Sequence, residues 1–211
     1  MPGERTLWQD VRELRPGTYL RLPQGNASPY WQAPPPEWSD EAAPPLAWYG
    51  GQLRSQLAAV TKACLPAGQP VGVYLSGGLD SSCITALAAQ FHQPPVHTYA
   101  IHFGAEYPNE LAFSSLVAAH CQTQHHVLEI TPQQLWQRLP ETMSALDDPI
   151  GDPLTVPNLL LGQLARETVS VILNGEGGDP CFGGPKNKPM LLNSLYGQAA
   201  TPESDNPLLT A

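Results

Sequence analysis

Two stretches of this chain contain the residue types and spacing of a phosphate-binding site. Residues 76–82 read SGGLDSS, and residues 174–184 read NGEGGDPCFGG. Glycine lets a backbone turn tightly and approach a ligand closely because it has no Cβ. Amides and hydroxyls that converge in such a turn bind anions, and carboxylate oxygens are the ligands that Mg²⁺ prefers. Together the two stretches predict a site for phosphate and a divalent ion.

The first stretch lies between a predicted strand and a predicted helix. Residues 71–75 are an apolar run with the length and β-branched content of a buried strand. Apolar residues then recur at helical spacing at Ile84, Leu87, Ala88 and Phe91. Asp80 or Ser81 could cap this helix, whose first amides have no internal partner and favour anions. The alternative is a tight turn with a cap and no ligand.

Strand and helix patterns alternate from residue 46 to residue 173. Helices are predicted over 46–65, 109–123, 132–146 and 155–168, the third interrupted by Pro140; further strands are predicted over 96–103, 126–130 and 170–173. This order predicts an α/β fold with a parallel, doubly wound sheet, on which the helix over 46–65 packs. Ligands bind at the carboxyl ends of strands in such sheets. Both glycine-rich stretches follow predicted strands there, after Leu75 and after Leu173.

The two ends of the chain differ from this central part. Residues 6–31 carry apolar alternation with turn signals at Pro16-Gly17 and at residues 24–26, which predicts a short N-terminal β-hairpin extension. Residues 33–45 are rich in proline and acid and are typical of a linker. The predicted organisation is therefore a hairpin and linker over 1–45, an α/β domain over 46–197 and a disordered tail over 198–211.

Composition excludes several classes of function. The 211 residues carry a formal charge of −9, which argues against a nucleic-acid partner. No apolar run is long enough to span a membrane. The four cysteines form no CxxC pair, so we expect reduced thiols in a cytoplasmic protein. His120, His125 and His126 suggest a metal site, but no carboxylate or cysteine lies at ligand spacing, and adjacent residues of a strand point opposite ways.

Both glycine-rich stretches resemble signatures of one enzyme family. SGGLDSS resembles the pyrophosphate-binding loop of the N-type ATP pyrophosphatases, whose fold is of the adenine nucleotide alpha hydrolase type. NGEGGDPCFGG resembles the S-G-E-G-x-D-E-x-F-G-G loop of the asparagine synthetase class, which is related to β-lactam synthetase. Residues 147–153, DDPIGDP, are similar to the D-E-P…D-P segment before that loop. Residues 14–17 and Tyr30-Trp31 resemble the joint between the glutaminase and synthetase domains.

The resemblance implies roles for individual residues. The residues that would cradle the departing pyrophosphate are Ser76, Gly77, Gly78, Ser81 and Ser82. The residues at positions that contact adenosine and ribose are Leu75, Ile101, Asn174 and Gly175. Asp80 and Asp179 match the magnesium-binding carboxylates. Glu176 matches the catalytic glutamate near the acyl-adenylate. With only three lysines in the chain, the ATP phosphates would be held by amides, hydroxyls and Mg²⁺.

The implied activity is that of an ATP-dependent ligase. A carboxylate substrate, aspartate or an analogue, would attack the α-phosphate of ATP, release pyrophosphate and then form an amide with ammonia or an amine. The transition state's negative charge would be stabilised by the metal and the aligned amides. A β-lactam-forming or tRNA-modifying ligase is an alternative, and the acidic charge disfavours tRNA.

The sequence also departs from the family pattern. The family's glutaminase uses an N-terminal cysteine, whereas this sequence begins Met1-Pro2-Gly3 and we expect it to lack that domain. Asn174 replaces a serine, and Pro180-Cys181 replaces a glutamate and an apolar residue. The family continues past the second loop through helices that supply a lysine and part of the substrate pocket, so we also expect that a glutaminase or the C-terminal half of the synthetase could be a separate chain. Lys186 or Lys188 could place a cation near the phosphates. The alternative function is a non-catalytic or split-enzyme ATP-binding module.

Overall fold

The computed structural model describes residues 4–23, 25–34, 43–147, 150–182 and 184. The chain divides into two compact units, residues 1–49 and residues 50–211, which we treat separately. Several predictions lie outside the described residues: the centre of the linker, the Asp148-Pro149 dipeptide, the cations Lys186 and Lys188, and the tail over 198–211.

The N-terminal unit contains the predicted hairpin in a shortened form. Strand β1 (Thr18–Leu20) pairs antiparallel with β2 (Ala27–Pro29), with Tyr19 opposite Ser28. Gly17, at φ +71°, accepts hydrogen bonds from the amides of Tyr30 and Trp31 at 2.8 and 3.2 Å. The residues before Pro16 add only an isolated bridge between Arg5 and Arg12, so the apolar alternation there does not extend the strands.

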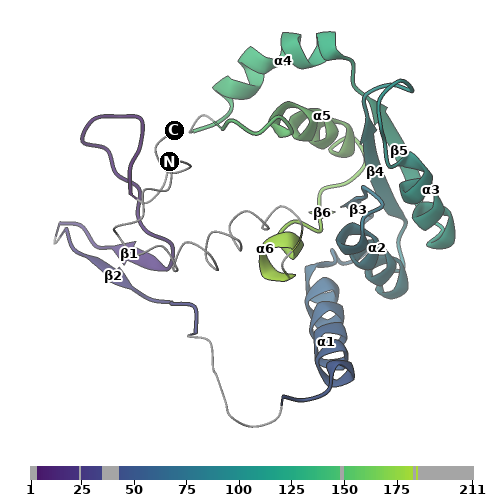
Figure 1. Cartoon of the computed structure of the whole chain (residues 1–211), viewed down its shortest axis with the longest axis horizontal. Helices are drawn as coiled ribbons and strands as arrows, with labels where there is room; N and C mark the ends of the chain where they lie inside the picture. The colour runs from purple at the N-terminus through teal and green to yellow at the C-terminus, as the bar shows by residue number, and fades with distance from the viewer. Residues whose placement is uncertain (1–3, 24, 35–42, 148–149, 183, 185–211) are drawn as a thin grey trace, which may run out of the picture. The chain divides into compact units, whose positions relative to one another are not determined.

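A four-stranded parallel sheet forms the centre of the second unit. Its strands are β3 (Val71–Tyr74), β4 (Val96–His102), β5 (Gln124–Glu129) and β6 (Ile172–Leu173), in the order β5-β4-β3-β6 (Figure 1). Gly72 pairs with both His97 on β4 and Ile172 on β6. The predicted parallel α/β sheet is confirmed.

Helices cover both faces of this sheet, because alternate strand residues point to opposite sides. Val71 and Val73 point toward α2 (Leu79–Phe91), where they pack on Ala88; α3 (Leu111–His120) lies beside α2. On the other face Tyr99 packs on Leu161 of α5 (Thr155–Ala165). The sheet is therefore doubly wound, as predicted.

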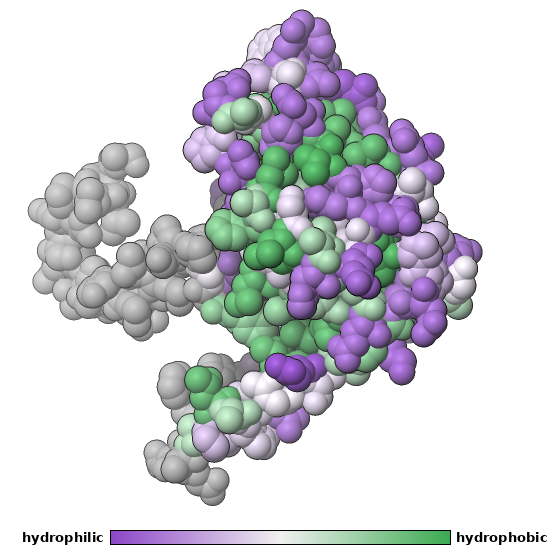
Figure 2. All heavy atoms as spheres, turned by 90° about the vertical axis from the view of Figure 1, so that its right-hand side faces the viewer, coloured by the Kyte–Doolittle hydropathy of each residue, from purple (hydrophilic) through white to green (hydrophobic). Residues whose placement is uncertain are grey.

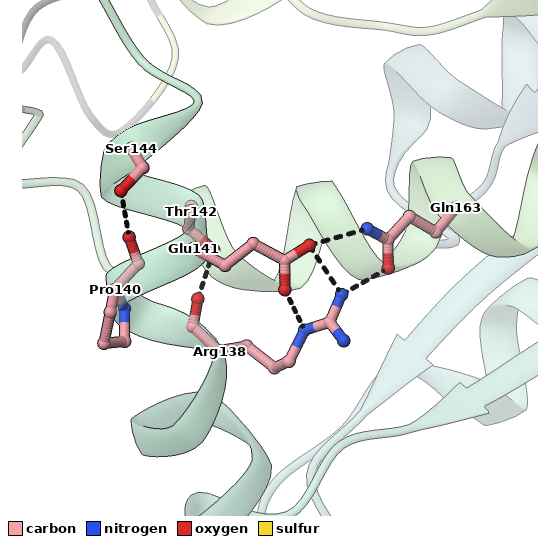
Figure 3. Close-up of polar contacts among 6 residues, drawn as sticks. All are labelled: Arg138, Pro140, Glu141, Thr142, Ser144 and Gln163. Atoms are coloured by element: carbon pink, nitrogen blue, oxygen red, sulfur yellow. Dashed lines mark hydrogen bonds and ion pairs between the residues drawn. The ribbon is translucent and has the colours of Figure 1, made fainter.

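Helix α4 (Pro132–Ser144) corrects one prediction, because it runs through Pro140 without a break. Thr131 and Gln134 form a capping box at its start. Arg138 pairs with Glu141 at 3.1 Å and donates a hydrogen bond to Gln163 of α5 at 2.7 Å (Figure 3). Packing on α5 holds α4 together across the proline, which lacks the amide that would bond to the preceding turn.

Helix α1 (Leu46–Cys64) corrects another prediction, because most of it does not pack on the sheet. Thr61 is its only buried residue, whereas Leu53 and Val60 are 38% and 62% exposed. Leu65, directly after the helix, does reach the core around Val71. Only the C-terminal end of α1 approaches the core, because the chain enters β3 a few residues later. Within the described residues, no helix combines the length and apolar character needed to cross a membrane.

Candidate functional site

The two glycine-rich stretches leave the sheet side by side. β4 and β5 lie on one side of β3 and β6 lies on the other, so the strand order reverses between β3 and β6. At such a reversal the following loops diverge to opposite faces and leave a crevice in which α/β proteins bind ligands. The loop after β3 leads into α2, and the loop after β6 leads into the short helix α6 (Gly178–Phe182) (Figure 1).

The first loop is closed by its own serine hydroxyls. The Gly78 amide donates to Ser76 Oγ at 3.2 Å, and Ser81 Oγ donates to the Gly78 carbonyl at 3.2 Å. The Ser76 and Ser81 hydroxyl oxygens lie 3.1 Å apart. Ser76 is exposed and Ser81 is buried, so Ser76 has the more accessible hydroxyl. Ser82 is half-buried in the first turn of α2.

The predicted helix cap is wrong, and the correction favours anion binding. Gly78, in an extended conformation, is the N-cap of α2, and no side chain caps the helix. Asp80 and Ser81 already lie in the first helical turn, so they cannot occupy the cap position. The first amides of this 13-residue helix therefore have no side-chain partner, and Gly78, Leu79 and Asp80 at its start are exposed. Amides in this arrangement suit a phosphate group.

The second loop is shaped by an asparagine turn and a short helix. Asn174 Oδ1 accepts a hydrogen bond from the Glu176 amide at 3.1 Å, which leaves Glu176 exposed. Pro180 is the third residue of α6, where an amide would have no partner within the helix. The Cys181 amide still donates to the Gly177 carbonyl at 3.1 Å. The proline therefore removes no hydrogen bond within α6.

Contacts at two glycines bring the loops together. A Cβ on Gly175 would lie 2.8 Å from the Ser81 nitrogen and 3.0 Å from Asp80 Cβ. A Cβ on Gly178 would collide with the Asp80 carboxylate. At Gly175 the nearest atom is the backbone nitrogen of Ser81, so only a residue without a side chain allows this approach; at Gly178 the neighbour is the end of the Asp80 side chain. The predicted meeting of stretches that lie far apart in the sequence is thus present in the structure.

The carboxylates predicted to bind metal begin two neighbouring helices. Asp80 is exposed in the first turn of α2, and Asp179, half-buried, follows Gly178 in α6. Gly184 lies against the Asp179 carboxylate and donates its amide to the Asp179 carbonyl at 3.0 Å. Neither loop contains a lysine or arginine. Oxygen ligands beside an uncapped helix end fit a magnesium ion with a phosphate group, so the residues present suit both.

The positions predicted to contact the nucleoside differ in accessibility. Leu75 is 1% exposed and donates its amide to the Tyr99 carbonyl at 2.8 Å, so only the rest of its backbone can meet a ligand. Tyr74 pairs with Tyr99, which places Ile101 level with Ser76 on the neighbouring strand. Ile101 is half-buried in the cluster around Tyr99, on the α5 face. The roles of these residues stay predictions.

The sequence did not reveal that the start of α3 supports the first loop. Gly77 has a φ of +92°, and a Cβ there would lie 2.6 Å from Phe113 Cβ and 2.7 Å from the Ser114 nitrogen. The paired glycines in the sequence indicate that another group comes close to the loop backbone, but they do not show which segment of the chain supplies it. Phe113 and Ser114 therefore join the site as residues that position the loop.

Of the histidines considered as metal ligands, His125 and His126 lie on β5, and His120 is the last residue of α3. His97 Nδ1 lies 2.9 Å from His126 Nε2, and the two rings stack beside Tyr99. On the opposite face, His125 Nδ1 lies 2.9 Å from the Thr98 hydroxyl. Burial lowers the pKa of both His97 and His125, and the nearby His126 lowers each further. No group of three potential metal-binding side chains occurs within the described ranges.

Comparisons of this sequence with known proteins find asparagine synthetases. The asparagine synthase family model matches residues 52–208. The chain is 32% identical over 193 residues to a putative glutamine-hydrolysing asparagine synthetase of Mycobacterium tuberculosis, covering 87% of this chain and 28% of that protein. It is 36% identical over 115 residues to glutamine-hydrolysing asparagine synthetase 1 of Bacillus subtilis, covering 54% of this chain and 18% of that protein. The chain thus spans less than a third of the length of these curated relatives.

Among solved structures, the ammonia-dependent NAD synthetase of Campylobacter jejuni is similar with a TM-score of 0.43 and 13% sequence identity. The match covers 62% of this chain and 58% of that one.

Proposed function

The chain belongs to the asparagine synthase family, and on that premise we propose that it binds ATP with Mg²⁺ between its two glycine-rich loops and acts as a ligase. The observation that carries the proposal is the contact of Gly175 and Gly178 with Ser81 and Asp80. The proposal is supported further by the uncapped start of α2 and by the strand-order reversal between β3 and β6, which both loops follow.

Each loop has a distinct task in this proposal. The amides at the start of α2, with the Ser76 hydroxyl, bind the phosphates that leave as pyrophosphate. Asp80 and Asp179 hold Mg²⁺, which offsets the negative charge of the triphosphate. Because neither loop contributes a lysine or arginine, the metal and the backbone amides carry this electrostatic work. Asn174 and Gly175, with Ile101 on β4 and the backbone of Leu75 after β3, line the path of the nucleoside.

The chemistry proposed is carboxylate activation. An oxygen of a small carboxylate, aspartate or an analogue, attacks the α-phosphate, the bond to the β-phosphate breaks, and pyrophosphate leaves. The resulting acyl-adenylate then reacts with ammonia or an amine, and AMP leaves as the amide forms. Glu176 orients the acyl-adenylate for this attack. Its backbone is positioned by the hydrogen bond that its amide donates to Asn174 Oδ1. All four cysteines are free, in keeping with the reducing cytoplasm in which we place the reaction.

A pyrophosphate-release assay tests the proposal. The full chain is incubated with ATP, Mg²⁺, ammonia and aspartate, and then with other carboxylates and amines. Asp80→Asn and Asp179→Asn should each lower release by about 10²-fold or more, because each removes a metal-binding oxygen. Glu167→Gln, an exposed change outside both loops, is the matched control and should leave release unchanged. Undiminished release in both aspartate variants would refute the assignment.

Pro180-Cys181, where the family loop has other residues, favours a second candidate, a binding module that needs a separate chain for turnover. Titration calorimetry with ATP and Mg²⁺ separates the two candidates. Binding with pyrophosphate release supports the ligase. Binding without release, followed by release when a separate glutaminase or synthetase C-terminal half is added, supports the module. If ATP does not bind at all, both candidates are wrong.

A further inference from the structure

The outer edge of β5 is open in the part of the chain that the structure describes. β5 pairs with β4 on one side, and no described strand lies on its other side (Figure 1). The strand contains no proline and no lysine, the residues that commonly protect an edge from pairing. An edge of this kind exposes unpaired amides and carbonyls to any strand that can match them.

The register with β4 shows which groups face outward. The Ile130 amide donates to the His102 carbonyl at 2.9 Å, so Ile130 and alternate residues before it direct their backbone groups to β4. In a parallel pair the intervening residues direct theirs the other way. The amides and carbonyls of His125, Val127 and Glu129 therefore face away from the sheet. Val127 is 45% exposed.

Helix α3 continues this surface beside the edge. Its ten residues, LAFSSLVAAH, include no Asp, Glu, Lys or Arg, and a helix that is apolar all round is normally buried all round. Only Ser114 and Ala118 are buried. Phe113 lies toward Gly77 and hence toward α2. At 100° per residue, the small residues Ala112, Ser115 and Ala119 lie on the opposite side of the helix, away from α2.

These small residues are exposed. The reason is that burial follows Ser114 and Ala118, one position away on the helix. Figure 2 faces the side of the molecule on which α3 and β5 lie, and apolar surface is visible there among polar groups.

We propose that two copies of the chain pair antiparallel through β5, about a two-fold axis at Val127, and join their four-stranded sheets into one. In this register the outward groups of Val127 meet those of the partner's Val127. His125 then lies opposite the partner's Glu129, so no two carboxylates face each other across the strands. The arrangement is self-complementary, as a two-fold interface must be.

The helices fit the same axis. Strands lie about 4.8 Å apart, and α3 covers β4 and β5, so the two copies of α3 come within about 10 Å of each other, a normal distance for packed helices. Small side chains at Ala112, Ser115 and Ala119 permit that approach. Because α3 carries no Asp, Glu, Lys or Arg, the approach of its two copies brings no like charges together, although each chain carries −9.

Light scattering coupled to size exclusion tests the pairing with the full chain. The wild type should have twice the 22.8 kDa mass of one chain. Val127→Pro removes an outward amide that β4 does not use, and Ala119→Arg puts a charge between the helices; each should give a single-chain mass with unchanged far-ultraviolet circular dichroism. Val60→Lys, at an exposed apolar position on α1, is the control and should remain a dimer.

Cross-linking tests the register. Val127→Cys should form an intermolecular disulfide on mild oxidation, because directly opposed, hydrogen-bonded residues have Cα atoms about 5.5 Å apart, within disulfide range. The wild type and Val60→Cys, oxidised in the same way, should form no intermolecular disulfide. A wild type that is monomeric at the concentration used for the variants, a dimer that survives both Val127→Pro and Ala119→Arg, or absence of the Val127→Cys disulfide would overturn the proposal.

Discussion

The backbone of Gly178 lies directly against the carboxylate of Asp80. One residue begins the helix after β6 and the other lies in the first turn of the helix after β3, so this contact joins the two loops of the site. The neighbouring contact of Gly175 with the Ser81 amide nitrogen strengthens the same junction. Changes at this junction should therefore affect ligand binding more than folding.

Gly178→Ala should weaken ATP binding with little loss of stability. The added methyl collides with the end of the Asp80 side chain, which can rotate away at low cost but then leaves the position at which it would hold Mg²⁺. We expect at least about 10-fold weaker binding of ATP with Mg²⁺ by calorimetry, which is about 1.4 kcal/mol. Gly151→Ala, where nothing lies within 4 Å, is the control. Equal affinities in the two variants would contradict the predicted junction.

Gly77→Ala should instead destabilise the fold. Its φ of +92° is unfavourable for alanine, and the methyl would strike the Ser114 backbone nitrogen, which cannot rotate away. We expect a loss of about 1–3 kcal/mol in the free energy of unfolding, measured by urea denaturation. Gly51→Ala, at an uncrowded position in α1, should stabilise the chain by about 0.5–1 kcal/mol. A neutral Gly77→Ala would show that α3 does not support the loop.

Stability should fall as the pH drops below neutrality. Burial lowers the pKa of His97 and His125 from the ordinary value of 6.5, so the unfolded chain binds protons more readily than the folded one. Their contribution is complete above pH 6.5 and is lost as the pH falls through their lower folded values. Urea midpoints measured across this range should decrease. His97→Gln should reduce the change of the urea midpoint with pH. Equal slopes of midpoint against pH in wild type and His97→Gln would contradict the assignment.

Pro140→Ala should stabilise the chain, because alanine restores an amide within α4 and removes the clash of the proline ring with the preceding turn. We expect a gain of about 1–3 kcal/mol in the free energy of unfolding by thermal and urea denaturation. Pro132→Ala is the matched control. Pro132 is the first residue of the helix, where a proline costs no hydrogen bond, so its replacement should bring no gain. Equal effects at both positions would show that α4 is relaxed at Pro140.

The amino-acid sequence by itself determined the local elements and the chemistry of the loops. The β-branched run over 71–75 and the glycines after it have few conformations open to them, so strand, turn and helix followed from residue type. The alternation of such units predicted the parallel sheet, since a strand that follows a helix in this way returns parallel to the first.

Only the tertiary structure decided which surfaces meet. Packing between segments distant in the chain decides that Phe113 supports Gly77 and that α4 passes through Pro140. It also decides that Ser115 faces solvent beside a β5 edge that no described strand covers. Periodicity shows that a face exists but not what covers it, because the free energy of burial depends on the partner surface as much as on the residue itself.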